Sequence, residues 1–385
     1  MKKKIAIFGS TGSIGTSLVD IILKDKKKFD VVLLTANKND KKLLKQAKQL
    51  NVKNLIITDN KKFNLLNKKN SRINIFNDFE NFNKIFKDKI DYVMSAITGI
   101  EGLIPTFKVI KYTKSIAIAN KESIICAWNI LKNEMEKYNT KFIPVDSEHF
   151  SIWSIINESS NKNIEKIYIT ASGGPFQKLP TSKFKNIKIK DAINHPNWKM
   201  GKKISVDSAT MMNKVFEVIE ARNIFDININ QIIILIHPKS YLHAMVKFKN
   251  AVSKLVLHDT DMKIPIYNSI YENKEYFKKT HNINLEKLNN LDLKNPDLNK
   301  FPIIKVLNKI PSYNSLFETI LITINDYLVD LFLKKKINFV SISKSLFTII
   351  NSKKFQKYKN IKPKNINQII DLKNLVQKEM NSLYK

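Results

Sequence analysis

The sequence predicts an α/β protein whose last part is helical, and three observations lead to this fold class. Short apolar segments of strand length alternate with stretches of helical spacing over the first half of the chain. The first segment, residues 4–8, runs directly into a glycine-containing turn and then a helix. Beyond residue 300 only helical spacing remains. We therefore expect a parallel sheet first, a central α+β region next and a C-terminal helical bundle.

Length and composition limit the classes of protein to consider. The chain has 385 residues, enough for two or three domains, and a formal net charge of +32. Its lysines are spread along the whole chain without a nucleic-acid-binding motif, so we expect no nucleic-acid partner. No apolar run approaches the roughly 20 residues of a membrane helix. The single Cys126 and a start unlike a signal peptide predict a cytoplasmic protein without a membrane partner.

Glycine is scarce, and its positions are therefore informative. The chain has 8 glycines, and none follows residue 201. A composition that avoids glycine should retain it where a side chain is sterically excluded, which predicts tight turns and close backbone approaches at these positions. They are Gly9, Gly12, Gly15, Gly99, Gly102, Gly173, Gly174 and Gly201.

The first three glycines predict a nucleotide-binding turn. The sequence GSTGSIG (9–15) follows the first strand and precedes a helix. Glycines let the backbone approach a pyrophosphate and a helix N-terminus favours its charge, so we expect an N-terminal Rossmann-type domain. The second strand, residues 31–35, ends at Asn37, Lys38 and Asn39, none of which is an acid suited to a ribose 2′-hydroxyl. This favours NADP over NAD, the alternative being an ordinary lysine-rich surface turn.

Polar residues follow further predicted strands, where open α/β sheets bind ligands. Strands are expected at residues 55–58, 92–96 and 115–119, and the last ends at Asn120, Lys121 and Glu122. The next strand, residues 142–145, also ends at a polar run, which is described below.

A candidate cation site follows this last strand. Asp146 and Glu148 stand two residues apart in a strand-end loop, where their carboxylates can converge on one cation. Such oxygen ligands suit Mg²⁺ or Mn²⁺ rather than zinc. The alternative is that Asp146 or Ser147 only caps the following helix. Glu217 offers a third carboxylate, which favours the cation site.

Two further segments have the composition of ligand-binding loops. Ser172 precedes two glycines after a strand at residues 168–171, so a hydroxyl and backbone amides can meet an anion. Residues 195–201 carry a tryptophan and a methionine, and form either a lid or a loop packed permanently on its domain. His237 and His243 lack the spacing of a zinc site, so we interpret both as structural.

A helix with a polar stripe follows this loop. Asp207 or Ser208 can supply its N-cap, and apolar residues bury its other sides. The stripe consists of Thr210, Asn213, Lys214 and Glu217, which recur at helical spacing. The stripe is either part of a site or a solvated face with a Lys214–Glu217 pair.

Together these segments resemble the 1-deoxy-D-xylulose 5-phosphate reductoisomerase family, NADPH- and metal-dependent enzymes of the non-mevalonate isoprenoid pathway. The resemblance covers residues 1–270 in family order and is looser beyond them. Its most specific part is KISVDSATMMNK (203–214) together with HPNW (195–198). The other matching runs are GSTGSIG (9–15), ANKES (119–123), PVDSEH (144–149), SGGPF (172–176), IHPKS (236–240) and DM with a following proline (261–265).

The resemblance implies a role for individual residues. The implied NADPH contacts are Thr11, Gly12, Ser13, Ile14, Asn37, Lys38, Asn39, Asn120, Glu122 and Gly201. The implied metal ligands are Asp146, Glu148 and Glu217. The implied substrate contacts are Lys121, Ser147, Glu148, Ser172, His195, Trp198, Met200, Ser208, Asn213, Lys214 and Glu217. The implied catalytic residues are Glu148, Lys121, His195 and Lys214, with Glu148 in proton transfer and Lys214 as the charge on the phosphate.

This chain departs from the family in two places. Asn37 stands where the family usually has glycine, which puts the backbone contact to the adenosine phosphate there in doubt. Val215 replaces another glycine, within a helix that tolerates the change.

The resemblance also implies a reaction and an organisation. A metal-dependent retro-aldol/aldol rearrangement of the phosphosugar would precede hydride reduction by NADPH to 2-C-methyl-D-erythritol 4-phosphate. We expect a homodimer, with a cofactor domain at 1–144, a catalytic and dimerisation domain at 145–270, a linker at 271–300 and a helical domain at 301–385. The alternatives are an NADP-dependent dehydrogenase without rearrangement and a basic binding protein without catalysis.

Overall fold

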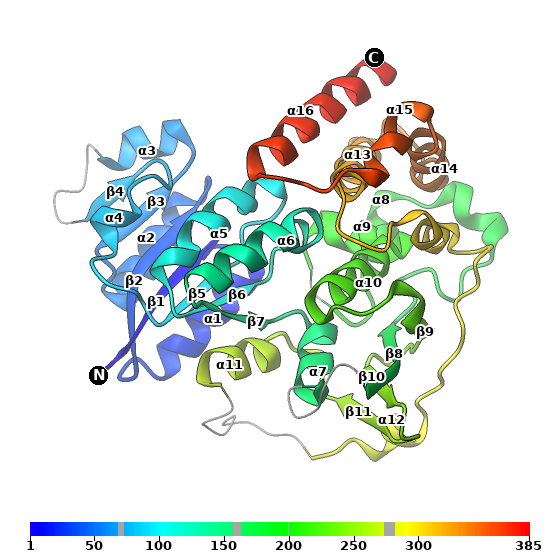
Figure 1. Ribbon diagram of the computed structural model, residues 1–385, viewed down its shortest axis with the longest axis horizontal. Helices are drawn as coiled ribbons and strands as arrows, with labels where there is room; N and C mark the ends of the chain where they lie inside the picture. Colours follow the sequence, from blue (N-terminus) through cyan, green and yellow to red (C-terminus); the bar gives the residue numbers. More distant parts are fainter. Residues whose placement is uncertain (68–72, 157–162, 199, 273–281) are drawn as a thin grey trace. The chain divides into compact units, whose positions relative to one another are not determined.

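The computed structural model describes residues 1–67, 73–156, 163–198, 200–272 and 282–385 (Figure 1). They form two compact units. The first unit consists of Met1–Ser123, Leu131–Asp146 and Met262–Thr280, and the second of Ile124–Ile130, Ser147–Asp261 and His281–Lys385. The predicted α/β fold class is confirmed. The predicted four-part division at residues 144, 270 and 300 stays a prediction.

The first unit is built on a seven-stranded parallel sheet. In spatial order its strands are β4 (Asn74–Phe76), β3 (Asn54–Ile57), β2 (Phe29–Ala36), β1 (Lys3–Phe8), β5 (Tyr92–Ser95), β6 (Ser115–Ile118) and β7 (Lys141–Pro144). The strand order reverses at β1, which pairs with both β2 and β5. In such sheets ligands bind outside the carboxyl ends of the strands at the reversal, which is where the glycine turn begins.

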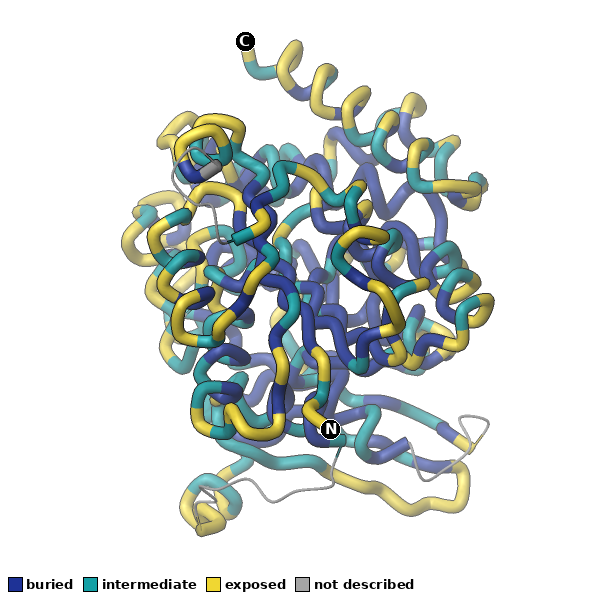
Figure 2. Tube along the Cα trace, turned by 90° about the vertical axis from the view of Figure 1, so that its left-hand side faces the viewer, coloured by how far each residue is buried: buried dark blue, intermediate teal, exposed yellow. Residues whose placement is uncertain are grey.

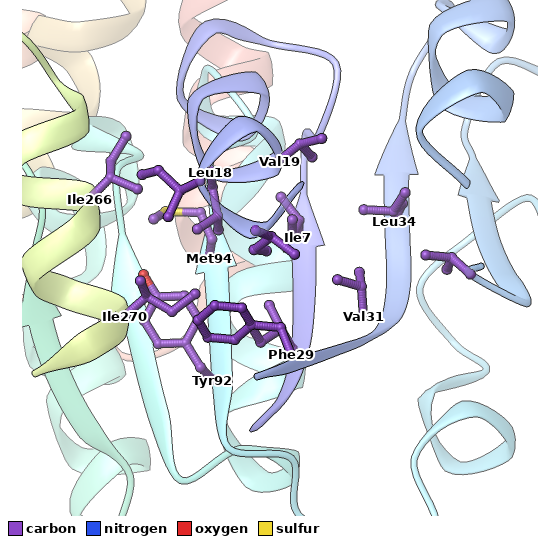
Figure 3. Close-up of a cluster of buried hydrophobic side chains, with 14 of the residues drawn as sticks. Ile7, Leu18, Val19, Phe29, Val31, Leu34, Tyr92, Met94, Ile266 and Ile270 are labelled. Carbon is purple, nitrogen blue, oxygen red and sulfur yellow. The ribbon is translucent and has the colours of Figure 1, made fainter. Parts of the chain in front are cut away.

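Helices of this unit follow its strands. They are α1 (Ser13–Lys24), α2 (Asp40–Leu50), α3 (Asn60–Asn67), α4 (Phe82–Ile85), α5 (Leu103–Val109), the ends of α6 (Lys121–Lys137), α11 (Lys263–Tyr271) and the 3-10 helices η1 (Ile100–Gly102) and η2 (Ile110–Tyr112). In Figure 3, Leu18 of α1 lies with Ile266 and Ile270 of α11 on one face of the sheet. The Tyr92 hydroxyl lies 2.7 Å from Ser269 Oγ of α11. A helix from late in the chain therefore completes this core.

The second unit contains a mixed four-stranded sheet. Its order is β11 (Ser253–Leu257), β10 (Leu242–Phe248), β8 (Ile164–Ala171) and β9 (Ile232–Ile236). β8 pairs with β9 in parallel and with β10 antiparallel, and β10 pairs antiparallel with β11. Two helices that carry predicted site residues pack on this sheet: α7 (Ser147–Ile156) against β10 and β11, and α10 (Met212–Phe225) against β9.

Helices make up the rest of the second unit. They are α8 (Ile189–Ala192), α9 (Lys202–Thr210), α12 (Leu285–Asn289), α13 (Leu316–Leu333), α14 (Phe339–Ile350), α15 (Lys353–Gln356), α16 (Ile366–Leu383) and the 3-10 helices η4 (Thr181–Asn186), η5 (Ile229–Gln231), η6 (Pro302–Lys309) and η7 (Lys357–Asn360). The predicted C-terminal helices are present, with α13 packed against α14 and α16. Exposed and buried residues alternate along α16 (Figure 2). Within the described residues, no helix is long and apolar enough to span a membrane.

The predicted helix with the polar stripe is two helices, because the chain breaks at Met211. This residue has a φ of 70°, in the left-handed region, and it ends α9 and precedes α10. The predicted N-cap at Asp207 or Ser208 is therefore wrong, because both residues lie inside α9. Asp207 is buried there and accepts a hydrogen bond of 2.8 Å from Asn325 Nδ2 on α13. This partner comes from a distant part of the chain, so the local sequence pattern does not reveal it.

A buried ion pair joins α10 to α13. Arg222 Nη2 lies 2.8 Å from Glu318 Oε1, and Arg222 Nη1 donates to the Pro311 carbonyl at 2.6 Å. The other carboxylate oxygen of Glu318 accepts from Ser315, the N-cap of α13. Burial raises the pKa of Glu318, although Arg222 and Ser315 act to lower it. The pair orders α10, the helix that carries Asn213, Lys214 and Glu217.

We expect Arg222→Met to reduce the free energy of unfolding by about 3–5 kcal/mol, because it leaves Glu318 buried without its charged partner. The double variant Arg222→Met/Glu318→Met should lose less, since it removes both charges. Urea unfolding followed by circular dichroism measures both. Lys334→Met, which breaks an exposed pair with Asp330, serves as control and should leave stability unchanged. A single variant as stable as the control would contradict the prediction.

Candidate functional site

Three carboxylates form a candidate metal site. Glu148 lies in the first turn of α7, Glu217 lies on α10, and Asp146 follows β7 as the last residue of the first unit. One carboxylate oxygen from each lies within 4.8 Å of the other two. His149 Nε2 lies 2.9 Å from the Glu217 carbonyl, which holds α7 and α10 together. Three hard oxygen donors at this separation fit Mg²⁺ or Mn²⁺.

Lysine side chains neutralise these carboxylates. Lys214 Nζ lies 3.1 Å from Glu148 Oε1 and also pairs with Glu217 Oε2. Lys121 Nζ lies 2.6 Å from Asp146 Oδ2. The alternative of a solvated Lys214–Glu217 face is wrong, because these side chains are only 6% and 3% exposed. Carboxylates that lie close together away from water repel one another, and neighbouring cations are needed to offset this repulsion. The lysines therefore belong to the site.

Glu148 is held in its ionised form. Burial acts to raise its pKa, but the Lys214 ammonium, His243 and the Ser147 hydroxyl together lower the pKa of Glu148 well below its usual value. The Ser147 hydroxyl donates to Glu148 Oε2. An ionised carboxylate at this position can bind a cation or accept a proton.

A second group of polar side chains surrounds the turn after β8. Ser172 Oγ lies 3.1 Å from His195 Nε2 and accepts a hydrogen bond from the Gly174 amide, also at 3.1 Å. Gly174 has a φ of +66°, and a Cβ placed on it would lie 3.0 Å from the Ser208 carbonyl. The turn therefore packs directly against the end of α9. The structure brings the side chains of Ser172 and His195 together, and the Ser208 backbone lies next to Gly174; their role as an anion site stays a prediction.

The protonation state of His195 follows from its backbone contacts. Its Nδ1 accepts hydrogen bonds from the amides of Asn197 and Trp198, at 3.1 and 3.0 Å. Nδ1 is therefore unprotonated, and Nε2 carries the hydrogen that is donated to Ser172. Burial, and then the Lys214 charge, lower the pKa of His195 to about 4. The imidazole is neutral near pH 7, which leaves the Ser172 hydroxyl hydrogen available to a ligand.

The predicted lid loop is anchored at its start. Asn197 Nδ2 donates to the Pro238 carbonyl and to Ser240 Oγ, both at 2.8 Å. The ring of Trp198 packs edge-on against His243, with centroids 6.2 Å apart. For residues 199–201 both interpretations, a lid and a packed loop, stay open. Lys199 lies outside the described residues.

Gly201, at the end of this loop, contradicts the expectation that every glycine marks a close backbone approach. It precedes α9 with a φ of −65°, and a Cβ there would have no neighbour within 4 Å. Its implied contact with a cofactor stays a prediction.

The glycine turn of the first unit has the predicted form. A Cβ on Gly9 would lie 2.6 Å from the Ala96 carbonyl, and one on Gly15 would lie 2.4 Å from the Gly9 carbonyl. Gly12 precedes α1 without a side-chain cap, so the first amides of the helix are open to a ligand. The implied cofactor residues Thr11, Ser13 and Ile14 belong to this turn and to the first residues of α1.

Other implied cofactor residues lie at the carboxyl ends of β2 and β6. Asn37 Nδ2 donates to Thr58 Oγ1 at 2.7 Å, Lys38 is exposed, and Asn39 caps α2. Asn120 caps α6 by accepting from the Ser123 amide at 2.7 Å, and it donates to Glu122 Oε2 at 3.2 Å. The roles of these residues stay predictions.

Sequence reasoning missed two histidines at the carboxylates. His149 holds Glu217 through its backbone carbonyl. The structural interpretation of His243 is incomplete, because its Nδ1 lies 3.9 Å from Glu148 Oε1 and its ring stacks on His258 at 3.7 Å. Only His149 had a signal in the sequence, its place next to Glu148. His237 is structural as expected, with its ring on the Leu291 carbonyl.

Comparisons with known proteins agree on one family. Three family models match the chain: 1-deoxy-D-xylulose 5-phosphate reductoisomerase over residues 5–128, its C-terminal domain over 142–225, and the DXP reductoisomerase C-terminal domain over 257–379. A 1-deoxy-D-xylulose 5-phosphate reductoisomerase of Pelagibacter ubique (strain HTCC1062) is 57% identical over 385 residues, with 99% of each chain covered.

Solved structures agree over the whole chain. The 1-deoxy-D-xylulose 5-phosphate reductoisomerase from Zymomonas mobilis in complex with NADPH is 29% identical, with a TM-score of 0.88 and 100% of both chains covered. A DOX-P reductoisomerase in complex with NADPH, fosmidomycin and magnesium is 29% identical, with a TM-score of 0.92, and the match covers 99% of this chain and 98% of that chain.

We expect His195 to remain a neutral imidazole with its hydrogen on Nε2 from pH 8 down to about pH 5, because its pKa is lowered to about 4. Long-range ¹H–¹⁵N spectra of the ligand-free protein, assigned with His195→Asn, report the tautomer and the titration. In unfolded protein the same residue should titrate near its ordinary value of about 6.5. A folded-state titration near 6.5, or a hydrogen on Nδ1, would refute the prediction.

Proposed function

Because this chain belongs to the 1-deoxy-D-xylulose 5-phosphate reductoisomerase family, we propose that it converts 1-deoxy-D-xylulose 5-phosphate into 2-C-methyl-D-erythritol 4-phosphate. The reaction uses NADPH and a divalent metal ion, as the ligands of the related structures suggest. The observation that carries the proposal is the group of three carboxylates within 4.8 Å of one another. Together with the family membership, this group argues against a dehydrogenase without rearrangement.

Asp146, Glu148 and Glu217 would hold the metal ion, since their oxygen atoms are the donors that Mg²⁺ and Mn²⁺ prefer. When bound, the metal supplies Lewis-acid polarisation of the substrate's ketone and hydroxyl oxygens for the retro-aldol/aldol rearrangement. Lys121 orients the Asp146 carboxylate through their ion pair. By the family resemblance, Lys121 and Ser147 would also contact the sugar, and the Ser147 hydroxyl already contacts the metal ligand Glu148.

The substrate phosphate would bind where the second unit gathers its neutral donors and Lys214. Ser172 offers a hydroxyl hydrogen, since its oxygen already accepts from the Gly174 amide and from His195. Ser208 lies half-buried at the adjoining end of α9. Asn213 and Lys214 begin α10 and now contact carboxylates. Once a cation neutralises those carboxylates, both can turn their donors to a phosphate.

Glu148 is the residue best placed to move a proton, because it is ionised and lies in the carboxylate cluster. The neutral His195 positions Ser172 and contributes no charge to the phosphate. Trp198 and Met200 belong to the loop that would cover the substrate, which excludes water from reactive intermediates. The glycine turn of the first unit would hold the pyrophosphate of NADPH, whose nicotinamide ring is the hydride donor when the cofactor is bound.

We also propose that the protein acts as a homodimer in the cytoplasm. The family resemblance supports the first point, and the single, buried Cys126 suits a reducing compartment. Sedimentation at several protein concentrations tests the oligomeric state.

Glu217→Gln should lower turnover by at least about 100-fold, because it removes a charged metal ligand. NADPH affinity should be unchanged, since the glycine turn belongs to the other unit. The assay follows NADPH absorbance with 1-deoxy-D-xylulose 5-phosphate and Mg²⁺ or Mn²⁺, and a chelator should abolish the reaction. Glu165→Gln, an exposed residue of β8, serves as the control. Equal loss of turnover and NADPH binding would refute the role of Glu217, and metal-independent activity would refute the function.

Ser172→Ala should lower kcat/KM by roughly 10- to 150-fold, the cost of losing one hydrogen bond to a charged group. The loss should appear mainly in the KM for the phosphosugar, because a phosphate contact is made in ground and transition state alike. Thr348→Ala on the exposed face of α14 is the matched control. An unchanged KM with reduced kcat would contradict a phosphate-binding role.

A further inference from the structure

Two side chains of α2 contact the glycine turn and are not among the cofactor residues considered so far. Gln46 donates from Nε2 to the Ser10 carbonyl at 2.9 Å, and its Oε1 accepts from Ser10 Oγ at 2.8 Å. Lys42 donates from Nζ to the Thr11 carbonyl at 3.1 Å and to Thr16 Oγ1 at 2.7 Å. Gln46 and Lys42 are four residues apart in the sequence, so they lie on the same face of α2. This face therefore contacts both Ser10 and Thr11 of the glycine turn.

Among the described residues of the first unit, no carboxylate offsets the charge of Lys42. Both of its acceptors are neutral oxygens, and no carboxylate of the described residues forms an ion pair with it. The side chain is half-buried, unlike the exposed Lys41 and Lys45 on the same helix. The neighbouring Asp40 is paired with Lys62 at 3.1 Å. A partly desolvated ammonium without a counter-ion is stabilised by any anion that binds beside it.

The position of Lys42 indicates which anion this is. Its backbone amide bonds to Asn39 Oδ1 at 3.2 Å, which places it in the first turn of α2, directly after the end of β2. In dinucleotide-binding sheets this strand end receives the adenosine ribose and distinguishes a 2′-hydroxyl from a 2′-phosphate. The Asn37 amide is turned towards Thr58 and offers little to the ribose. The Lys42 backbone thus lies at the strand end where the sequence had indicated Asn37, Lys38 and Asn39, and its ammonium reaches from there to the glycine turn.

The ammonium can bind a phosphate without giving up its present contacts. A lysine has three N–H donors, and Lys42 uses two of them, on Thr11 and Thr16. Thr16 in turn donates to the Gly12 carbonyl at 2.6 Å, so the lysine is held against the first turn of α1. Holding the flexible side chain in place before the ligand arrives reduces the entropy lost on binding.

We propose that Lys42 binds the 2′-phosphate of NADPH and is a specificity-determining residue for NADPH over NADH. The proposal rests on the NADPH dependence argued above. Gln46 has a different role, since it contacts only Ser10 and so shapes the turn for either cofactor.

The test compares NADPH and NADH, which differ only in the 2′-phosphate. Dissociation constants are measured by fluorescence titration for the wild type, Lys42→Met, Lys42→Arg and Gln46→Leu, with Lys41→Met and Lys45→Met as controls on the same helix. Lys42→Met should weaken NADPH binding about tenfold or more and leave NADH binding unchanged. Lys42→Arg should retain most of the preference, and Gln46→Leu should weaken both cofactors alike. The controls should match the wild type.

Each other outcome is informative. If Lys42→Met weakens both cofactors equally, or neither, Lys42 does not read the 2′-phosphate and the proposal is overturned. A loss as large in Lys41→Met or Lys45→Met would indicate a general effect of charge and would overturn it as well. If the wild-type protein binds NADH as tightly as NADPH, the proposed NADPH dependence is refuted. This outcome is distinct from a failure of the Lys42 proposal alone. Thermal unfolding of each variant shows that Lys42→Met remains folded, and Lys42→Gln replaces it if it does not.

Discussion

The second unit depends on holding negative charges close together away from water. The carboxylates of Glu148 and Glu217, which lie within 4.8 Å of each other, repel strongly in a medium less polar than water, so neighbouring cations must offset the repulsion. Lys214 does so between Glu148 and Glu217, from inside a helix that is buried on nearly all sides. α10 keeps its place because His149 bonds its backbone and Arg222 ties its far end to Glu318. In the proposed reaction, a metal ion and the substrate phosphate would each replace part of this network.

Two short backbone features position the groups around this cluster. The left-handed residue Met211 separates α9 from α10, so Ser208 ends one helix and Asn213 begins the next. The turn at Gly174 approaches the Ser208 carbonyl so closely that a side chain there would have to displace it. The turn after β8, the end of α9 and the start of α10 each carry a predicted phosphate ligand. In the first unit, a neighbouring helix positions the glycine turn in a similar way, since α2 contacts it through Lys42 and Gln46.

Because the chain contains so many lysines, its composition does not identify the few that lie at the candidate sites. Most of the charge of +32 lies on solvated side chains, whose contribution is screened by water and salt. Lys121 and Lys214 differ because their side chains are only 13% and 6% exposed beside carboxylates, and Lys42 differs because its ammonium contacts the glycine turn. Composition alone therefore indicates a basic protein but not where its charge is used.

The sequence by itself determined the elements with strong periodicity and the residues whose chemistry is local. It predicted the parallel strands, the glycine turn, the helical C-terminal part and the carboxylates, because the spacing of apolar residues and strand-end loops is encoded over short distances. It missed β4, a strand of only three residues. It also predicted one continuous helix where the left-handed backbone of Met211 separates α9 from α10. Only the tertiary structure paired Asp207 with Asn325, packed α11 into the core of the first unit, placed Lys42 against the glycine turn and set His243 beside Glu148. Those contacts join residues far apart in the chain, and no local pattern specifies which of many similar side chains will meet.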